Sequence, residues 1–322
     1  MKKVVYVIGA GASTEFGSMP VGQELARSIQ KLADDDLSGS DNRPVIRKAI
    51  SMAGGYGAAH EKALGRIRDS ILTRDSIDDF VAEWNDQDCL ADVARYCIAH
   101  EILRGERATA LGAISIQNMT IPQGMERLRG TWLDAIVRYS NSHFPRRSLV
   151  DALSCSSFVT FNYDRCIEFY LYNYFSHSLG MAPAEAGRAL REIHIEHVYG
   201  VAGHLPELGG NVPFGQADPS WLYEAASPIK TYCESVESDR LDRIQRKLNG
   251  ADRIVFLGCA FHEQNLDLLF SGSPPSAEVW ATGLGLRGRR RDLVQEFFRV
   301  GGIKLNGMKA GEMLAHHHDD LF

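Results

Sequence analysis

The chain has 322 residues, of which 44% are apolar and 24% are charged, and its formal net charge is −6. A chain of this length buries one large core or two modest ones. The negative charge argues against direct nucleic-acid binding, which usually needs a basic surface. The six cysteines form no C-x-x-C pair, and no apolar run approaches the roughly 18 residues that cross a bilayer. We therefore expect a cytoplasmic protein with reduced, buried cysteines that binds neither metal nor membrane.

The first element is the segment VVYVIGAGASTEFG, residues 4–17. A short apolar strand opens there through Gly9 and Gly11 into helix-like sequence, and such a loop lets backbone N–H groups approach a phosphate. Thr14 stands where the common dinucleotide motif has its third glycine, and no lysine follows as in a Walker loop. The segment predicts a nucleotide site, with a plain strand-to-helix turn as the alternative.

The next elements are mostly helical. Apolar spacing predicts a helix over about 21–32, the acidic segment 34–42 predicts a loop, and the pattern from about 42 to 145 is almost wholly helical. Strands are then predicted over 156–161, 192–199, 253–258 and 277–282. Helices are predicted over 164–177, after the strand at 253–258, and from the last strand to about 300.

Strands that alternate with helices predict an α/β fold, with a Rossmann-like, mostly parallel sheet and helices on both faces. The helical stretch of about 42–145 would be an insertion in a single domain covering residues 1–322. The basic run from Arg287 to Arg291 is interpreted as a solvated helix start, with a phosphate-facing patch as the alternative.

Two polar side chains, Asn162 and Asp164, directly follow the second predicted strand. The carboxyl edge of an open α/β sheet is where such folds bind ligands. Capping of the next helix would explain Asp164 alone, but the nearby Asn162 exceeds what a cap requires. The pair therefore predicts polar groups of a binding site.

His197 lies in the third predicted strand, next to a turn at Gly200. Strand alternation places Ile195, His197 and Tyr199 on one face and His194 on the other, so the two histidines do not converge on a metal. A hydrogen-bonded core histidine is the alternative to a residue at a site mouth. The histidine alone does not decide between the two.

The fourth predicted strand ends at Gly258. A glycine there would let the backbone approach a ribose or phosphate, and a plain turn is the alternative. No lysine or arginine stands near Cys259 in the sequence, so little supports a nucleophilic thiol at that position.

Together these segments resemble the sirtuin-like (silent information regulator) superfamily, and within it the bacterial NAD hydrolases of antiphage defence. GAGAS with Gly17 and Pro20 is similar to the family's first NAD loop, and TFNYD to its strand-end Asn/Asp motif. HVYGVAGHLP with VPFG is similar to the segment that holds its histidine, and FLGCAFHEQN to its later ribose- and phosphate-contacting turn. The motifs stand in family order and bracket residues 7–265.

The resemblance implies an NAD+ glycohydrolase that cleaves the nicotinamide–ribose bond, with NAD as substrate and no metal. Asn162 would hold the nicotinamide ribose and an attacking water, Asp164 would face the carboxamide, and His197 would act as general base. The further implied contacts to the dinucleotide come from Gly9, Ala10, Gly11, Ala12, Ser13, Gly17, Pro20, Thr160, Tyr163, Gly200, Gly258, Cys259, Phe261 and Asn265.

The resemblance also implies a biological role, an NAD-depleting abortive-infection effector. We expect its control by homo-oligomerisation or by a separately encoded protein. One alternative is a module that senses NAD or ADP-ribose without cleaving it. Another is a sirtuin-type deacylase or ADP-ribosyltransferase, which is disfavoured because the four zinc cysteines and the arginine after the glycine loop are missing.

Overall fold

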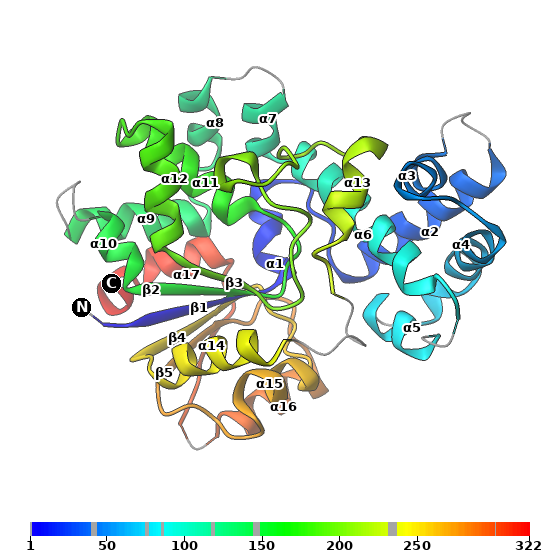
Figure 1. The fold of residues 1–322 in the computed structure, drawn as a ribbon. Helices are drawn as coiled ribbons and strands as arrows, with labels where there is room; N and C mark the ends of the chain where they lie inside the picture. The colour runs from blue at the N-terminus through cyan, green and yellow to red at the C-terminus, as the bar shows by residue number, and fades with distance from the viewer. Residues whose placement is uncertain are drawn as a thin grey trace.

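The computed structural model describes residues 2–39, 44–74, 77–84, 87–116, 120–143, 149–230, 237–299 and 301–322. A six-stranded sheet forms its centre, with the strand order β3-β2-β1-β4-β5-β6 (Figure 1). The strands are β1 (Val4–Ile8), β2 (Ser156–Thr160), β3 (His194–His197), β4 (Arg253–Leu257), β5 (Glu278–Thr282) and β6 (Lys304–Asn306). All neighbouring pairs run parallel, which confirms the predicted Rossmann-like α/β fold.

Helices lie on both faces of this sheet (Figure 1). They are α1 (Ala10–Ser13), α2 (Gly22–Ser38), α3 (Val45–Ala53), α4 (Ala58–Ser70), α5 (Ile77–Glu83), α6 (Leu90–Ala108), α7 (Ala110–Ile116), α8 (Ile121–Arg127), α9 (Trp132–His143), α10 (Leu149–Ser154), α11 (Cys166–Asn173), α12 (Pro183–Glu192), α13 (Pro219–Ala226), α14 (Ser238–Asn249), α15 (Glu263–Phe270), α16 (Arg289–Phe297), α17 (Ala310–His316) and α18 (His318–Leu321).

The pleat of β1 divides its side chains between two cores. Tyr6 and Ile8 join the core formed with α9, α10, α11, α12 and α17. Val5 and Val7 join the core formed with α14, α15 and α16 on the other face. All five residues of β1 are buried, as expected for a central strand of a parallel sheet that is covered on both sides.

The described residues of the predicted insertion form helices joined by turns, with an isolated bridge between Thr109 and Gly17. Its helices pack in two separate parts of the molecule. Helices α3 to α6 pack with α2 beside the sheet (Figure 1), and they extend the core that contains Val5. Leu111 of α7, Leu128 directly after α8 and Trp132 of α9 instead join the core on the opposite face.

The acidic segment 34–42 was wrongly predicted as a loop, because residues 34–38 continue α2. The carboxylate of Asp36 is buried and accepts the backbone N–H of Ile46 at 2.7 Å, at the start of α3. This contact stabilises Asp36 in its helical conformation. The partner, Ile46, is ten residues away, so the local sequence does not reveal it. Residues 40–42 of the predicted loop lie outside the described residues.

Two other differences concern the strands. The third strand is shorter than predicted because α12 occupies residues 183–192, and alternation ends at His197. Tyr199 therefore packs in the opposite core from Ile195, which corrects the expectation that these side chains share one face. The edge strand β6 was not predicted, and α16 ends at Phe297 rather than near 300.

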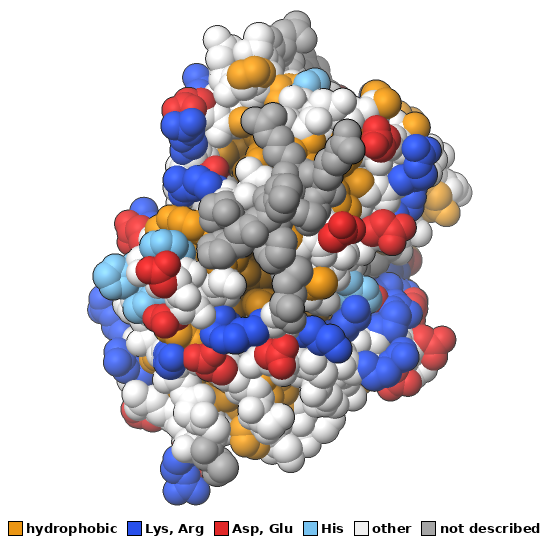
Figure 2. Space-filling model, turned by 90° about the vertical axis from the view of Figure 1, so that its left-hand side faces the viewer, with side chains coloured by type: hydrophobic (Ala, Val, Ile, Leu, Met, Phe, Trp, Pro, Cys, Tyr) orange, Lys and Arg blue, Asp and Glu red, His pale blue; other side chains and the backbone are white. Residues whose placement is uncertain are grey.

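The described cysteines are free thiols; Cys97 and Cys166 are buried as predicted, but Cys155 is exposed. Cys233 lies outside the described residues. None of the helices described here is long and apolar enough to cross a membrane. Figure 2 shows one face of the molecule, on which Lys and Arg side chains are interspersed with Asp and Glu side chains.

Candidate functional site

A cavity of about 780 Å³ opens at the carboxyl ends of β1, β4 and β5, beside residues 161 and 162 that follow β2. Ligand pockets in proteins measure roughly 300–1,000 Å³, so this volume suits a small-molecule ligand. The strand order reverses at β1, which pairs with both β2 and β4. Open α/β sheets bind their ligands at this switch point.

The glycine loops form one wall of the cavity by packing against each other. The N–H of Gly9 donates to Leu257 O at 2.9 Å, and that of Gly11 donates to Gly258 O at 3.0 Å. A Cβ atom on Gly258 would lie 2.0 Å from Ala12 N. Close backbone contact between the loops after β1 and β4 is therefore a structural reason for these glycines, independent of any phosphate.

Gly258→Ala is expected to destabilise the protein more than Gly272→Ala does. Both glycines have a left-handed φ, of +62° and +78°, but a Cβ on Gly272 would have no atom within 4 Å. The cost at Gly272 should be about 1–2 kcal/mol for the backbone alone, whereas Gly258 adds a clash between two backbone segments. Urea unfolding of both variants measures the difference, and equal losses would contradict the close packing of the loops.

Asn162, Ser13 and Asp164 form a buried hydrogen-bonded chain. The Ser13 hydroxyl donates to Asp164 Oδ2 at 2.8 Å, so its oxygen is left to accept a bond. The Asn162 side-chain amide donates to Ser13 Oγ at 2.9 Å and to Gly9 O at 3.2 Å. Ser13 Oγ and Gly9 O both accept hydrogen bonds from this side chain, so they must face its nitrogen. The network therefore fixes the orientation of the amide and directs Oδ1 away from these two acceptors.

The Oδ1 atom of Asn162 is buried and finds no hydrogen-bond partner among the described residues. The residue is 7% exposed and lines the main cavity. It also lines an adjoining pocket of about 90 Å³, to which Ser13, Tyr163 and Asp164 contribute. A buried acceptor without a partner costs free energy, so a hydrogen-bond donor that reached this oxygen would be stabilising.

His197 does not line either cavity, and both of its ring nitrogens are bonded. Nδ1 lies 2.8 Å from Asn162 O, which only accepts, so Nδ1 carries a proton. Nε2 lies 2.7 Å from Glu168 Oε1 on α11.

Burial disfavours the charged imidazole, but attraction to Glu168 outweighs this effect and raises the pKa of His197. Burial likewise opposes the carboxylate, yet His197 lowers the pKa of Glu168. Each residue therefore favours the charged form of the other, and the two form an ion pair whenever His197 is protonated.

The wild type is expected to lose stability relative to His197→Gln as the pH rises. His197 has a pKa above its unfolded value of about 6.5, so its contribution is complete below that pH and disappears as the pH passes the raised folded value. The glutamine variant lacks this titration. Thermal unfolding of both proteins from pH 6 to pH 9 measures the effect, and a constant difference in melting temperature would contradict it.

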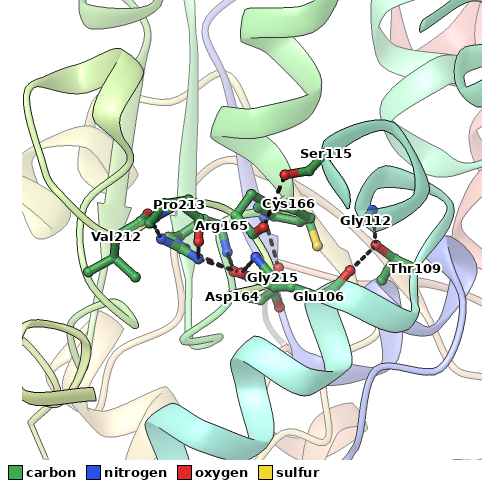
Figure 3. Close-up of polar contacts among 11 residues, drawn as sticks. Glu106, Thr109, Gly112, Ser115, Asp164, Arg165, Cys166, Val212, Pro213 and Gly215 are labelled. Carbon is green, nitrogen blue, oxygen red and sulfur yellow. Dashed lines mark hydrogen bonds and ion pairs between the residues drawn. The ribbon is translucent and has the colours of Figure 1, made fainter. Parts of the chain in front are cut away.

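A second buried ion pair, Glu106–Arg165, fixes the segment that carries Asp164 (Figure 3). The Arg165 guanidinium donates to Glu106 Oε1 at 3.0 Å and to Oε2 at 2.5 Å, and the exposed fractions of the two side chains are 1% and 0%. The backbone N–H of Arg165 and that of Gly215 also donate to this carboxylate. Remaining guanidinium hydrogens reach the carbonyl oxygens of Val212 and Pro213. Helix α6 is thereby connected to the loop after β2 and to the segment at residues 212–215.

The predicted site residues fall into three groups. The main cavity is lined by Gly9, Ala10, Gly11, Asn162, Gly258, Cys259, Phe261 and Asn265. The adjoining pocket adds Ser13, Pro20, Tyr163 and Asp164. Neither is lined by Ala12, Gly17, Thr160, His197 or Gly200. In the last group, Thr160 Oγ1 accepts the backbone N–H of Asn162 at 3.0 Å. Thr160 therefore supports a site residue without lining the cavity. Burial raises the pKa of the Cys259 thiol, which disfavours a thiolate nucleophile.

Several cavity residues were not predicted as site residues. Tyr199 lines the cavity and donates its hydroxyl to Asn265 Oδ1 at 2.8 Å. Glu15 also lines it, but its carboxylate accepts the N–H groups of Trp132 and Gly311 at 2.9 and 3.0 Å. Arg290 lies in the basic run and lines the cavity, so it is not only a solvated residue of a helix start.

No three or more His, Cys, Asp or Glu side chains converge in a metal-binding arrangement within the described ranges. Comparisons of the chain with protein-family models, with curated proteins and with solved structures gave no match. The interpretation of the cavity therefore depends on its geometry and on the sequence motifs.

Proposed function

We propose that the protein is an NAD+ glycohydrolase that converts NAD+ and water into nicotinamide, ADP-ribose and a proton. The observation that carries the proposal is the unpaired, buried Oδ1 of Asn162, a residue that lines the cavity at the sheet's switch point. The nicotinamide ring is a cationic leaving group, so the transition state places positive charge on the ribose, as in other glycoside hydrolyses. The Oδ1 of Asn162, whose amide nitrogen is held by Ser13 and Gly9, would orient the ribose hydroxyls and the attacking water.

The other two proposed catalytic residues act from behind Asn162 in this geometry. Asp164 orders Ser13 and thereby the amide, and its negative charge next to the adjoining pocket would stabilise the developing cation. His197 holds the main-chain oxygen of Asn162. We propose positioning as its first role; it becomes a general base only after Nε2 leaves Glu168.

The test follows NAD+ by chromatography in the presence of the full-length purified chain and of its Asn162→Ala variant. Release of nicotinamide and ADP-ribose by the wild type alone supports the proposal. Conversion no faster than that of the variant contradicts it. The resemblance supports the wider proposal of an antiphage effector that is controlled by self-association or by a partner protein.

A second candidate, a module that binds NAD+ or ADP-ribose without cleaving it, is favoured by the engagement of both His197 nitrogens. With both nitrogens engaged, His197 provides no general base at the cavity wall. The same assay separates the two functions, because a binding module gives saturable binding and returns intact NAD+.

A further inference from the structure

One end of the cavity is cationic and apolar, and the chemistry proposed at Asn162 does not use it. The segments after β5 and β6 form this end, where Leu284, Leu286 and Met308 line the cavity beside Arg290 and Lys309. The carboxylate of Glu15 also lines the cavity and attracts Lys309, but it already accepts the N–H groups of Trp132 and Gly311. Leu284 is 62% exposed, so it presents an apolar surface that the protein itself does not cover.

This end lies far from Asn162 across the sheet. β2 and β5 are separated by β1 and β4 in the strand order, so their carboxyl ends are three interstrand steps, or about 14 Å, apart. A ligand that reaches both Asn162 and Arg290 is therefore elongated. In the proposed function, nicotinamide lies near Asn162 and the adenosine half lies near Arg290.

The charges at the adenosine end favour a phosphate over a hydroxyl group. In dinucleotide-binding folds, a carboxylate accepts the ribose 2′-hydroxyl of NAD, whereas an arginine accommodates the 2′-phosphate of NADP. Here an arginine is present, and the carboxylate of Glu15 in the same cavity is already bonded to two backbone N–H groups. A guanidinium binds phosphate through two parallel hydrogen bonds, and the neighbouring leucines offer an apolar surface to the purine.

We infer that the cavity takes a dinucleotide of the NADP type, whose extra ribose phosphate is bound by Arg290 with Lys309. The inference rests on the proposed function, because that function assigns the adenosine half to this end. Hydrolysis of NADP+ at the same bond would release nicotinamide, 2′-phospho-ADP-ribose and a proton.

The test measures binding of ADP-ribose and 2′-phospho-ADP-ribose to the full-length chain by titration calorimetry. The wild type should bind the phosphorylated ligand about tenfold or more tightly, as expected for a hydrogen bond between charged groups. Arg290→Ala should remove most of this preference. Arg289→Ala is the matched control, since Arg289 is the exposed neighbour on the same helix and does not line the cavity.

The outcomes separate this inference from the proposed function. Equal affinities of the wild type for both ligands overturn the inference, even if NAD+ is hydrolysed. A preference that depends on Arg290 supports it, even if neither dinucleotide is cleaved, and in that case only the proposed activity fails. If Arg290→Ala lowers the affinity for both ligands equally, the side chain binds a phosphate that both ligands carry. The assignment of Arg290 to the extra phosphate is then wrong.

Discussion

Glu106→Ala is expected to lower the free energy of unfolding by about 3–5 kcal/mol, because it leaves the guanidinium of Arg165 buried without its counter-charge. Arg165 is 1% exposed, so water cannot replace the lost carboxylate. The N–H groups of Arg165 and Gly215 also lose their acceptor. Domains are stable by only about 5–15 kcal/mol, so the loss is a large fraction of the total. Urea unfolding followed by circular dichroism measures it.

Two further variants identify the cause of the expected loss. Glu126→Ala is the matched control, because Glu126 pairs with Arg129 on the surface, where both side chains are mostly exposed, and its removal should change stability little. The double variant Glu106→Leu with Arg165→Met should be more stable than Glu106→Ala, since no unpaired buried charge remains. A double variant as unstable as the single one would show that packing, rather than charge, determines the loss.

The sheet was largely predictable from the sequence because its central strands are continuous apolar runs. β1 and β4 are buried at every position, and each is followed by a glycine that allows the two loops to pack closely. β6 gave no such signal, since it has three residues, pairs only with β5 and begins at the exposed Lys304. A strand at the sheet edge needs fewer apolar side chains than a central one, so its pattern is too short to detect.

The position of the site was predictable, but the partners of its residues were not. Asn162 and Asp164 follow a strand, and topology brings them to the switch point of the sheet. The bonds of His197 to Glu168 and of Arg165 to Glu106 join residues 29 and 59 positions apart. Local patterns carry no information on such pairs. The sequence therefore predicted a role for His197 as general base but not its bond to Glu168.

The two ion pairs have a common consequence for the proposed active site. Glu106–Arg165 fixes the chain directly after Asp164, and His197 fixes the main-chain oxygen of Asn162. Asn162 and Asp164 are therefore held from both sides before any ligand binds. Such preorganisation avoids the cost of ordering polar groups during the reaction, which is the source of most electrostatic catalysis.

Asn162→Ala is expected to reduce kcat for NAD+ cleavage by about 10²–10³-fold, similar to the loss of an oriented polar group in other hydrolases. The variant removes the unpaired Oδ1 of a cavity-lining residue but retains the Ser13–Asp164 bond. Asn173→Ala is the matched control: Asn173 is a buried asparagine on α11 that bonds Phe169 O at 2.7 Å and lines neither the main cavity nor the adjoining pocket. Its loss should affect stability and leave turnover near that of the wild type. Comparable losses of turnover in both variants, measured by nicotinamide release at a temperature where both are folded, would assign the effect to folding rather than to the orphaned oxygen.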